Sequence, residues 1–228
     1  MRKAIIGLFI VAFIVAGCQN TCTECEQEKA ELNDEITQLN TQIQNLTIEN
    51  ERISEFHWYY GNALISKVQA VEAQLKGNIL NEKSTFYYDE AEFFFSFGTG
   101  GGDFEKPKNL SIQAREKYQL SNQYYTETIE YLDNARQYAE DNDLMDNNIK
   151  LSKMNIELNN YMIESCKYYE QAIEEYIIDL NDGDDKYSIK GDKYIEKANE
   201  QIELYNKLLK EMELYEFELN VQKLADFK

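Results

Sequence analysis

Four cysteines and one histidine are the side chains in this 228-residue chain that could support nucleophilic, redox or metal chemistry. Cys22 and Cys25 have the C-x-x-C spacing of thiol redox motifs, but no thioredoxin-like alternation of strand and helix patterns surrounds them. A zinc site needs four ligands, and His57 is the only imidazole available. A nucleophilic Cys166 would also need His57 as its base, and the two fall in different predicted segments. The sequence therefore predicts no enzyme, no catalytic residue, no metal site and no cofactor.

The N-terminal segment gives Cys18 a different chemistry. Two basic residues precede an apolar run over residues 4–16, which is shorter than the roughly 20 residues that a membrane-spanning helix needs. This order is that of a secretory signal. Residues 15–18, Val-Ala-Gly-Cys, resemble the lipobox of prokaryotic membrane lipoproteins, in which the signal is removed and the cysteine carries lipid. The resemblance implies a signal peptide over 1–17 and lipidation of Cys18, with the chain anchored in the cell membrane on its extracytoplasmic side.

The charge of the chain narrows the class of partner. Acidic residues number 42 against 23 basic ones, and the formal net charge is −19. Nucleic acids and anionic lipid headgroups are bound by clustered positive charge, so we expect no nucleic-acid partner. The simplest explanation of the acidity is that a high net charge keeps the chain soluble. A cationic ligand or adaptation to high salt is the alternative explanation.

A seven-residue repeat begins near residue 26. Its apolar stripe contains β-branched residues or asparagine at position a and mostly leucine at position d: Ile36, Ile43 and Asn50, with Leu32, Leu39, Leu46 and Ile53. This combination favours a parallel two-stranded coiled coil, which predicts a lipidated N-terminus and coiled-coil stalk over 18–56. In a homodimer, Cys22 and Cys25 would fall at positions a and d and could form an interchain disulfide. Packing of the stripe on later helices, or on an unknown envelope protein, stays open.

Three long amphipathic patterns occupy residues 110–140, 146–180 and 187–225. Apolar residues recur in each with the period of an α-helix, and polar residues cover the other side. The connectors are short and polar, so consecutive helices should run antiparallel. The predicted fold class is all-α, with an N-terminal coiled-coil stalk followed by a bundle of long antiparallel helices over 57–228.

The segment before these patterns is expected to be irregular. Polar residues over 78–84 predict a break in the helix, and an aromatic run over 86–97 leads to a Gly-rich loop near 98–109. The loop lacks the neighbouring strand and the Lys-Ser/Thr pair of a phosphate-binding loop. We expect the phenylalanines to pack under the bundle, whereas an exposed aromatic patch would mark a binding surface.

Seventeen tyrosines are the least usual feature of the composition. A tyrosine buries its ring while its hydroxyl seeks a polar partner, which suits the interior boundary of a narrow helical bundle. We therefore expect a structural or interaction protein that presents a helical bundle away from the membrane. The alternative is a ligand-binding or sensory module with a site in the bundle lined by Tyr and Phe.

Overall fold

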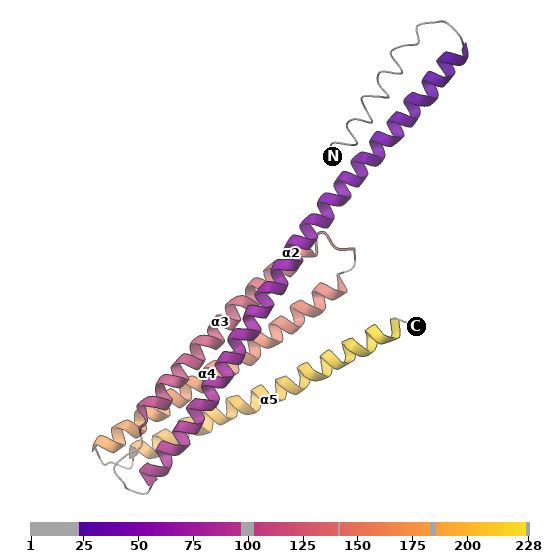
Figure 1. The fold of residues 1–228 in the computed structure, drawn as a ribbon. Coiled ribbons are helices and arrows are strands. Elements are labelled where there is room, and N and C mark those ends of the chain that lie inside the picture. The colour runs from indigo at the N-terminus through magenta and orange to yellow at the C-terminus, as the bar shows by residue number, and fades with distance from the viewer. Residues whose placement is uncertain (1–22, 97–102, 141, 183–185, 227–228) are drawn as a thin grey trace. The chain divides into compact units, whose positions relative to one another are not determined.

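The computed structural model describes residues 23–96, 103–140, 142–182 and 186–226, and it is all-helical over these residues (Figure 1). The all-α prediction is therefore confirmed. The helices are α2 (Thr23–Ser96), α3 (Glu105–Ala135), α4 (Asp143–Asp182) and α5 (Lys186–Asp226). Contacts divide the chain into two units, Met1–Ser54 and Glu55–Lys228.

No helix among the described residues is both long enough and apolar enough to cross a bilayer. Residues 1–22, which include the expected signal peptide, lie outside the described part of the chain.

Contacts show that consecutive helices of the second unit are antiparallel, because each contact joins the N-terminal part of one helix to the C-terminal part of its neighbour. Figure 1 shows α3 and α4 lying side by side and running in opposite directions. Contacts of this kind are Ser84–Pro107 between α2 and α3, Lys108–Glu174 and Arg136–Asp146 between α3 and α4, and Glu175–Lys190 and Asn147–Tyr215 between α4 and α5.

The side of α2 that faces the bundle is built from small residues. Ala63, Ala70 and Ala73 are buried, and Ala63 packs in one cluster with Leu132 of α3 and Met145 of α4. A close approach occurs at Gly77, where an added Cβ would lie 2.8 Å from Cε1 of the buried Tyr118 ring. Small residues on α2 therefore allow a tyrosine-bearing helix to pack closely against it.

The short distance between Gly77 and the Tyr118 ring predicts that two glycine substitutions in α2 change the stability of the fold in opposite directions. Gly77→Ala is expected to lower the free energy of unfolding by about 1–3 kcal/mol, because the new methyl group displaces the Tyr118 ring. Gly61→Ala is the control, since nothing lies within 4 Å of the added Cβ, and it should gain about 0.5–1 kcal/mol from helix propensity. Urea unfolding measures both changes. Stabilisation by both variants would show that the Tyr118 ring has room to move.

The predicted helix break at 78–84 is wrong, since α2 continues to Ser96. The polar side chains of this segment have partners in the bundle, which is why they do not interrupt the helix. Tyr118 donates its hydroxyl hydrogen to Asn78 Oδ1 over 2.9 Å, and Ser84 Oγ donates to the Pro107 carbonyl over 2.7 Å. The polar residues of segment 78–84 therefore indicate hydrogen bonds to α3, and they do not indicate a turn.

The start and the end of α3 also differ from expectation. Its first residues, 105–109, belong to the region predicted as a Gly-rich loop, and Pro107 occupies the first turn, where its missing N–H costs nothing. The glycines of that loop lie outside the described residues. The helix ends at Ala135 instead of near 140, and Tyr138 N–H donates to the Ala135 carbonyl in the turn that follows.

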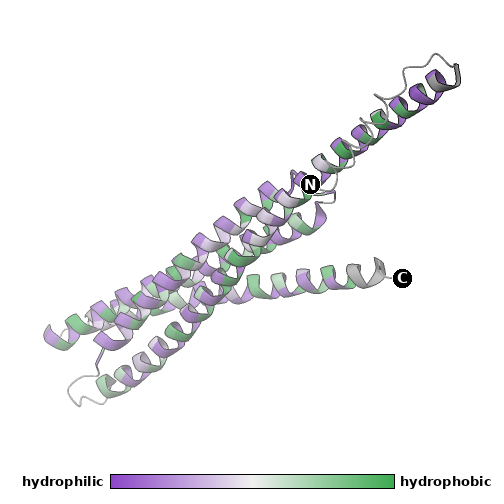
Figure 2. Ribbon diagram, turned by 45° about the horizontal axis from the view of Figure 1, so that its top comes forward, coloured by the Kyte–Doolittle hydropathy of each residue, from purple (hydrophilic) through white to green (hydrophobic). Residues whose placement is uncertain are grey.

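The two halves of α5 are buried to different degrees. Ala198, in the first half, is fully buried against α4. Leu214, Phe217 and Val221 are exposed, and Figures 1 and 2 show the C-terminal half of α5 diverging from the other helices. The first half of α5 therefore belongs to the core of the second unit together with α2, α3 and α4, whereas its C-terminal half contributes little to it.

Candidate functional site

The predicted lipidation and disulfide residues are not among the described side chains. Cys18 and Cys22 precede the first described residue, and Cys25 lies in α2 but its side chain is outside the described part. The remaining thiol, Cys166, is described in full. Over the described residues, no group of three His, Cys, Asp or Glu side chains is placed to hold a metal ion.

Cys166 is a fully buried free cysteine on α4. Its Sγ atom lies 3.6 Å from Asn81 Oδ1, and its carbonyl accepts a hydrogen bond from Ser111 Oγ over 3.2 Å. Burial raises the pKa of the thiol to about 12, so it stays protonated at neutral pH. Because the thiolate is the reactive form, the position of Cys166 gives it a packing role.

A polar layer crosses the interior between α2, α3 and α4. Ser121 Oγ donates to the Ala70 carbonyl over 2.8 Å, and the buried Asn159 donates through Nδ2 to both Ser121 Oγ and Asn122 Oδ1 over 2.9 Å. Nearby, Arg115 makes two hydrogen bonds to the Glu170 carboxylate, over 2.8 and 2.9 Å. Buried polar contacts of this kind are satisfied in one helix register only, so they favour a single arrangement of the three helices.

Two buried tyrosines of α3 belong to the same interior. Tyr118 and Tyr125 are almost completely buried, and the Tyr125 hydroxyl donates to Gln74 Oε1 over 3.2 Å. Burial raises the pKa of Tyr125 to about 12 and raises the pKa of Tyr118 further. The expectation that tyrosines bury their rings and pair their hydroxyls holds at both positions, although Tyr118 also lines a hollow of about 220 Å³ together with Tyr205 of α5.

These raised pKa values predict alkaline unfolding. In the unfolded chain the phenols lose their protons near the ordinary value of 10.0, whereas the folded state retains them. The unfolded state therefore binds fewer protons above that pH, and stability falls as the pH rises through 10 towards 12. Urea unfolding at pH 8 and at pH 10.5 measures the loss. Tyr125→Phe should reduce it, and a stability that is independent of pH over this range would contradict the burial of the phenols.

His57 and Trp58 lie in an aromatic cluster near the start of the second unit. The Trp58 ring makes edge contacts with Tyr59 and Tyr131, with centroids 4.8 and 6.0 Å apart, and His57 lies edge-on to Phe56 at 5.8 Å. The cluster ties α2 to the end of α3. Trp58 reaches α3 through Tyr131 but its side chain is 56% exposed, and the exposed His57 makes its ring contact with Phe56, its neighbour in the sequence.

The aromatic run at the end of α2 divides between two environments. Tyr88 is buried, and Phe95 packs against Phe104 with ring centroids 6.1 Å apart. Phe86 and Phe93, in contrast, are exposed. The expectation of packing under the bundle therefore holds for one side of the helix, and the exposed aromatic residues lie on the other.

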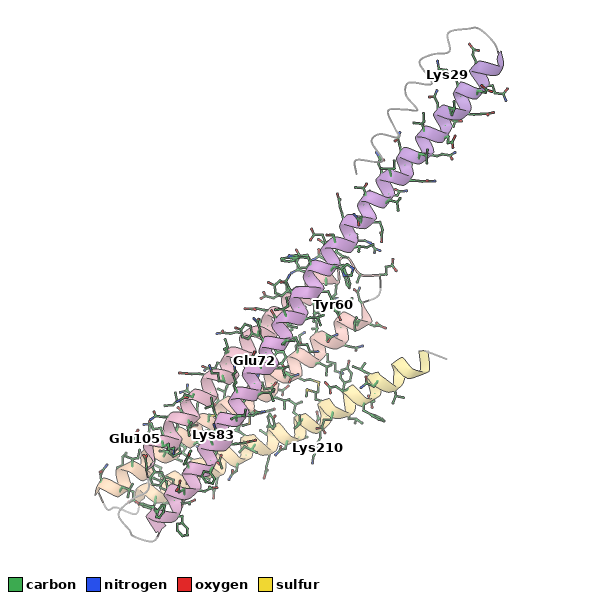
Figure 3. The ribbon with its side chains drawn as sticks, in the orientation of Figure 1. Lys29, Tyr60, Glu72, Lys83, Glu105 and Lys210 are labelled. Carbon is green, nitrogen blue, oxygen red and sulfur yellow. The ribbon has the colours of Figure 1, made fainter. Side chains whose placement is uncertain are left out.

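The largest described hollow lies between α2 and the start of α3, with a volume of about 440 Å³. Lys83 and Glu105, labelled in Figure 3, are both in its lining. The Lys106 ammonium lies 3.2 Å from the Tyr87 ring centroid, so the chain itself supplies the cation for that ring. Its lining holds two lysines, Lys83 and Lys106, and two acidic residues, Asp103 and Glu105, so their formal charges offset one another. Sequence reasoning missed it because its residues come from two helices.

The apolar stripe of α2 in the first unit is exposed. Leu46 leaves 68% of its surface accessible, and Leu39 and Ile43 leave 50% and 44%. Leucine and isoleucine at these spacings are normally covered by a partner helix. The stripe is the strongest candidate for a functional surface in this unit.

No known protein family matches this chain, and neither a characterised protein nor a solved structure resembles it at a significant level.

Proposed function

We propose that this chain is a lipid-anchored extracytoplasmic interaction protein that presents a helical bundle away from the membrane. The observation that carries the proposal is the exposed heptad stripe of α2, read together with the lipobox that precedes it. Acyl groups on Cys18 would hold the N-terminus in the membrane, and the stalk would separate the bundle from it. The proposed role is structural, which is supported by the buried and protonated state of the described thiol, Cys166.

The stalk is proposed to pair with a second copy in parallel. Two N-termini anchored in the same leaflet start side by side, so a parallel pair requires little further ordering. The a and d residues of the stripe match the composition that favours two parallel strands, and Asn50 at position a would fix the register. Cys22 and Cys25 fall on the same stripe, which would allow the pair to become covalent outside the membrane.

The pairing is tested with a chain from Thr21 to Lys228, which contains every described residue. Under reducing conditions this chain is expected to sediment as a dimer, and Leu46→Lys should convert it to a monomer by placing a charge in the apolar seam. Ile48→Lys is the matched control, because Ile48 is also an exposed aliphatic residue, at 64%, but lies off the stripe. A monomeric parent chain, or equal effects of the two lysines, would reject pairing through the stalk.

A further inference from the structure

The outward side of α2 within the second unit carries large aliphatic residues. Leu64, Val68, Val71, Leu75 and Ile79 leave between 41% and 67% of their surfaces exposed. The side that faces the bundle carries alanine, serine and glycine in their place, so the bulkiest residues of this segment point away from its own core. Figure 2 shows hydrophobic residues recurring along this helix. Soluble monomers rarely leave a contiguous apolar surface of this kind uncovered.

The spacing of these residues is that of a helix-pairing seam. They follow one another at intervals of three and four residues. Ile53, Leu64 and Leu75 are separated by steps of eleven residues, and eleven residues complete about three whole turns of an α-helix. An eleven-residue repeat continues a coiled-coil seam with a change of supercoil, without ending it. The seven-residue repeat over 32–53 is thus followed in the sequence by an eleven-residue repeat, and apolar residues continue along one side of the helix.

The charge pattern favours a second copy as the partner that covers this face. In a parallel pair in register, each seam residue meets its own counterpart, so any charge on the seam would be repelled. No Asp, Glu, Lys or Arg occupies the stripe from Leu32 to Ile79, on which His57 also falls, and the first charged residue along it is Glu82. A membrane surface fits less well, because helices that lie on lipid carry basic polar faces, whereas acidic residues outnumber basic ones over 55–96.

We propose that the outward face of α2 in the second unit binds the same face of a second copy, in parallel and in register, through Leu64, Val68, Val71, Leu75 and Ile79. This inference rests on the stalk pairing proposed above and extends it into the bundle. The helical bundles of two copies are then joined directly through α2, and the seam ends where Glu82 of one copy would approach Glu82 of the other.

Cysteine cross-linking of the full chain in its membrane fraction tests this contact. Cys22→Ser and Cys25→Ser remove two other thiols, and the buried Cys166 stays in place. Leu64→Cys and Leu75→Cys are each expected to give at least about fivefold more disulfide-linked dimer on mild oxidation than Gln69→Cys, an exposed control on another side of the helix. Unchanged helical circular dichroism shows that each exposed replacement leaves the fold intact.

The pattern of linkage separates this inference from the stalk pairing. Leu46→Cys reports on the stalk alone. Strong linkage at Leu46→Cys, with Leu64→Cys and Leu75→Cys no higher than the Gln69→Cys control, would overturn the contact through the bundle and leave the stalk pair standing. Linkage at only one of the two bundle positions would indicate antiparallel packing and would also overturn it. Linkage at both bundle positions without linkage at Leu46→Cys supports the contact and rejects the stalk pair.

Discussion

Leu158→Ala is expected to lower the free energy of unfolding by about 2–5 kcal/mol, the range for truncating a buried leucine. Leu158 is fully buried on α4, next to Asn159 of the polar layer. Removing its branched side chain loses the transfer free energy of the buried carbons and leaves a cavity that the neighbouring helices fill only in part. The hydrogen bonds of Asn159 to α3 restrict that relaxation, because they hold the helices in one register.

Ile202→Ala is the matched comparison for this prediction. The sequence pattern places Ile202 on a core stripe as well, but on α5 its side chain is only partly buried. Its loss should therefore stay below about 2 kcal/mol, since less apolar surface is returned to water. Urea unfolding at one fixed protein concentration measures both. Equal losses for Leu158→Ala and Ile202→Ala would mean that α5 packs as tightly as α4.

Cys18→Ser is expected to abolish attachment to the membrane through lipid. The hydroxyl of serine does not replace the thiol that accepts the lipid in the lipoprotein class, and processing of that class follows lipidation. The variant should therefore keep residues 1–17, and no acylated form should be found. Detergent phase partition and the intact mass of the purified chain measure these two effects.

The matched control for the anchor is Cys25→Ser, which removes a thiol seven residues further along without touching residues 15–18. It should be processed and should partition into detergent like the parent chain. A Cys18→Ser protein that is fully processed and still partitions into detergent as efficiently as the parent would rule out Cys18 as the anchor.

The sequence predicts the three later helices well because each has one buried side. Residues such as Ala114 and Tyr118 on α3 recur with the helical period, and both are buried. The end of α3 is less well predicted, because the helix stops at Ala135 while polar and aromatic residues continue beyond it. Helix ends depend on tertiary contacts such as the ion pair between Arg136 and Asp146, which spans 3.0 Å.

α2 shows what the sequence pattern does not resolve. Its large aliphatic residues suggest a single stripe, but the buried side is formed by residues such as Ala70 and Gly77, which carry little hydrophobic signal. The polar segment 78–84 was expected to break the helix, because the sequence does not show that its side chains form hydrogen bonds with hydroxyl and carbonyl groups of α3. Lipidation at Cys18 is predicted from a local motif, whereas the hollow between Lys83 and Glu105 requires the folded arrangement.

The central proposal, a lipid-anchored pair of helical bundles, is tested most directly by the intact mass of the protein released gently from membranes under non-reducing conditions. The account predicts a complex of two chains, each beginning at Cys18 and each carrying the added mass of acyl groups. A single chain that begins at Met1 and carries no acyl group would contradict both the anchor and the pairing.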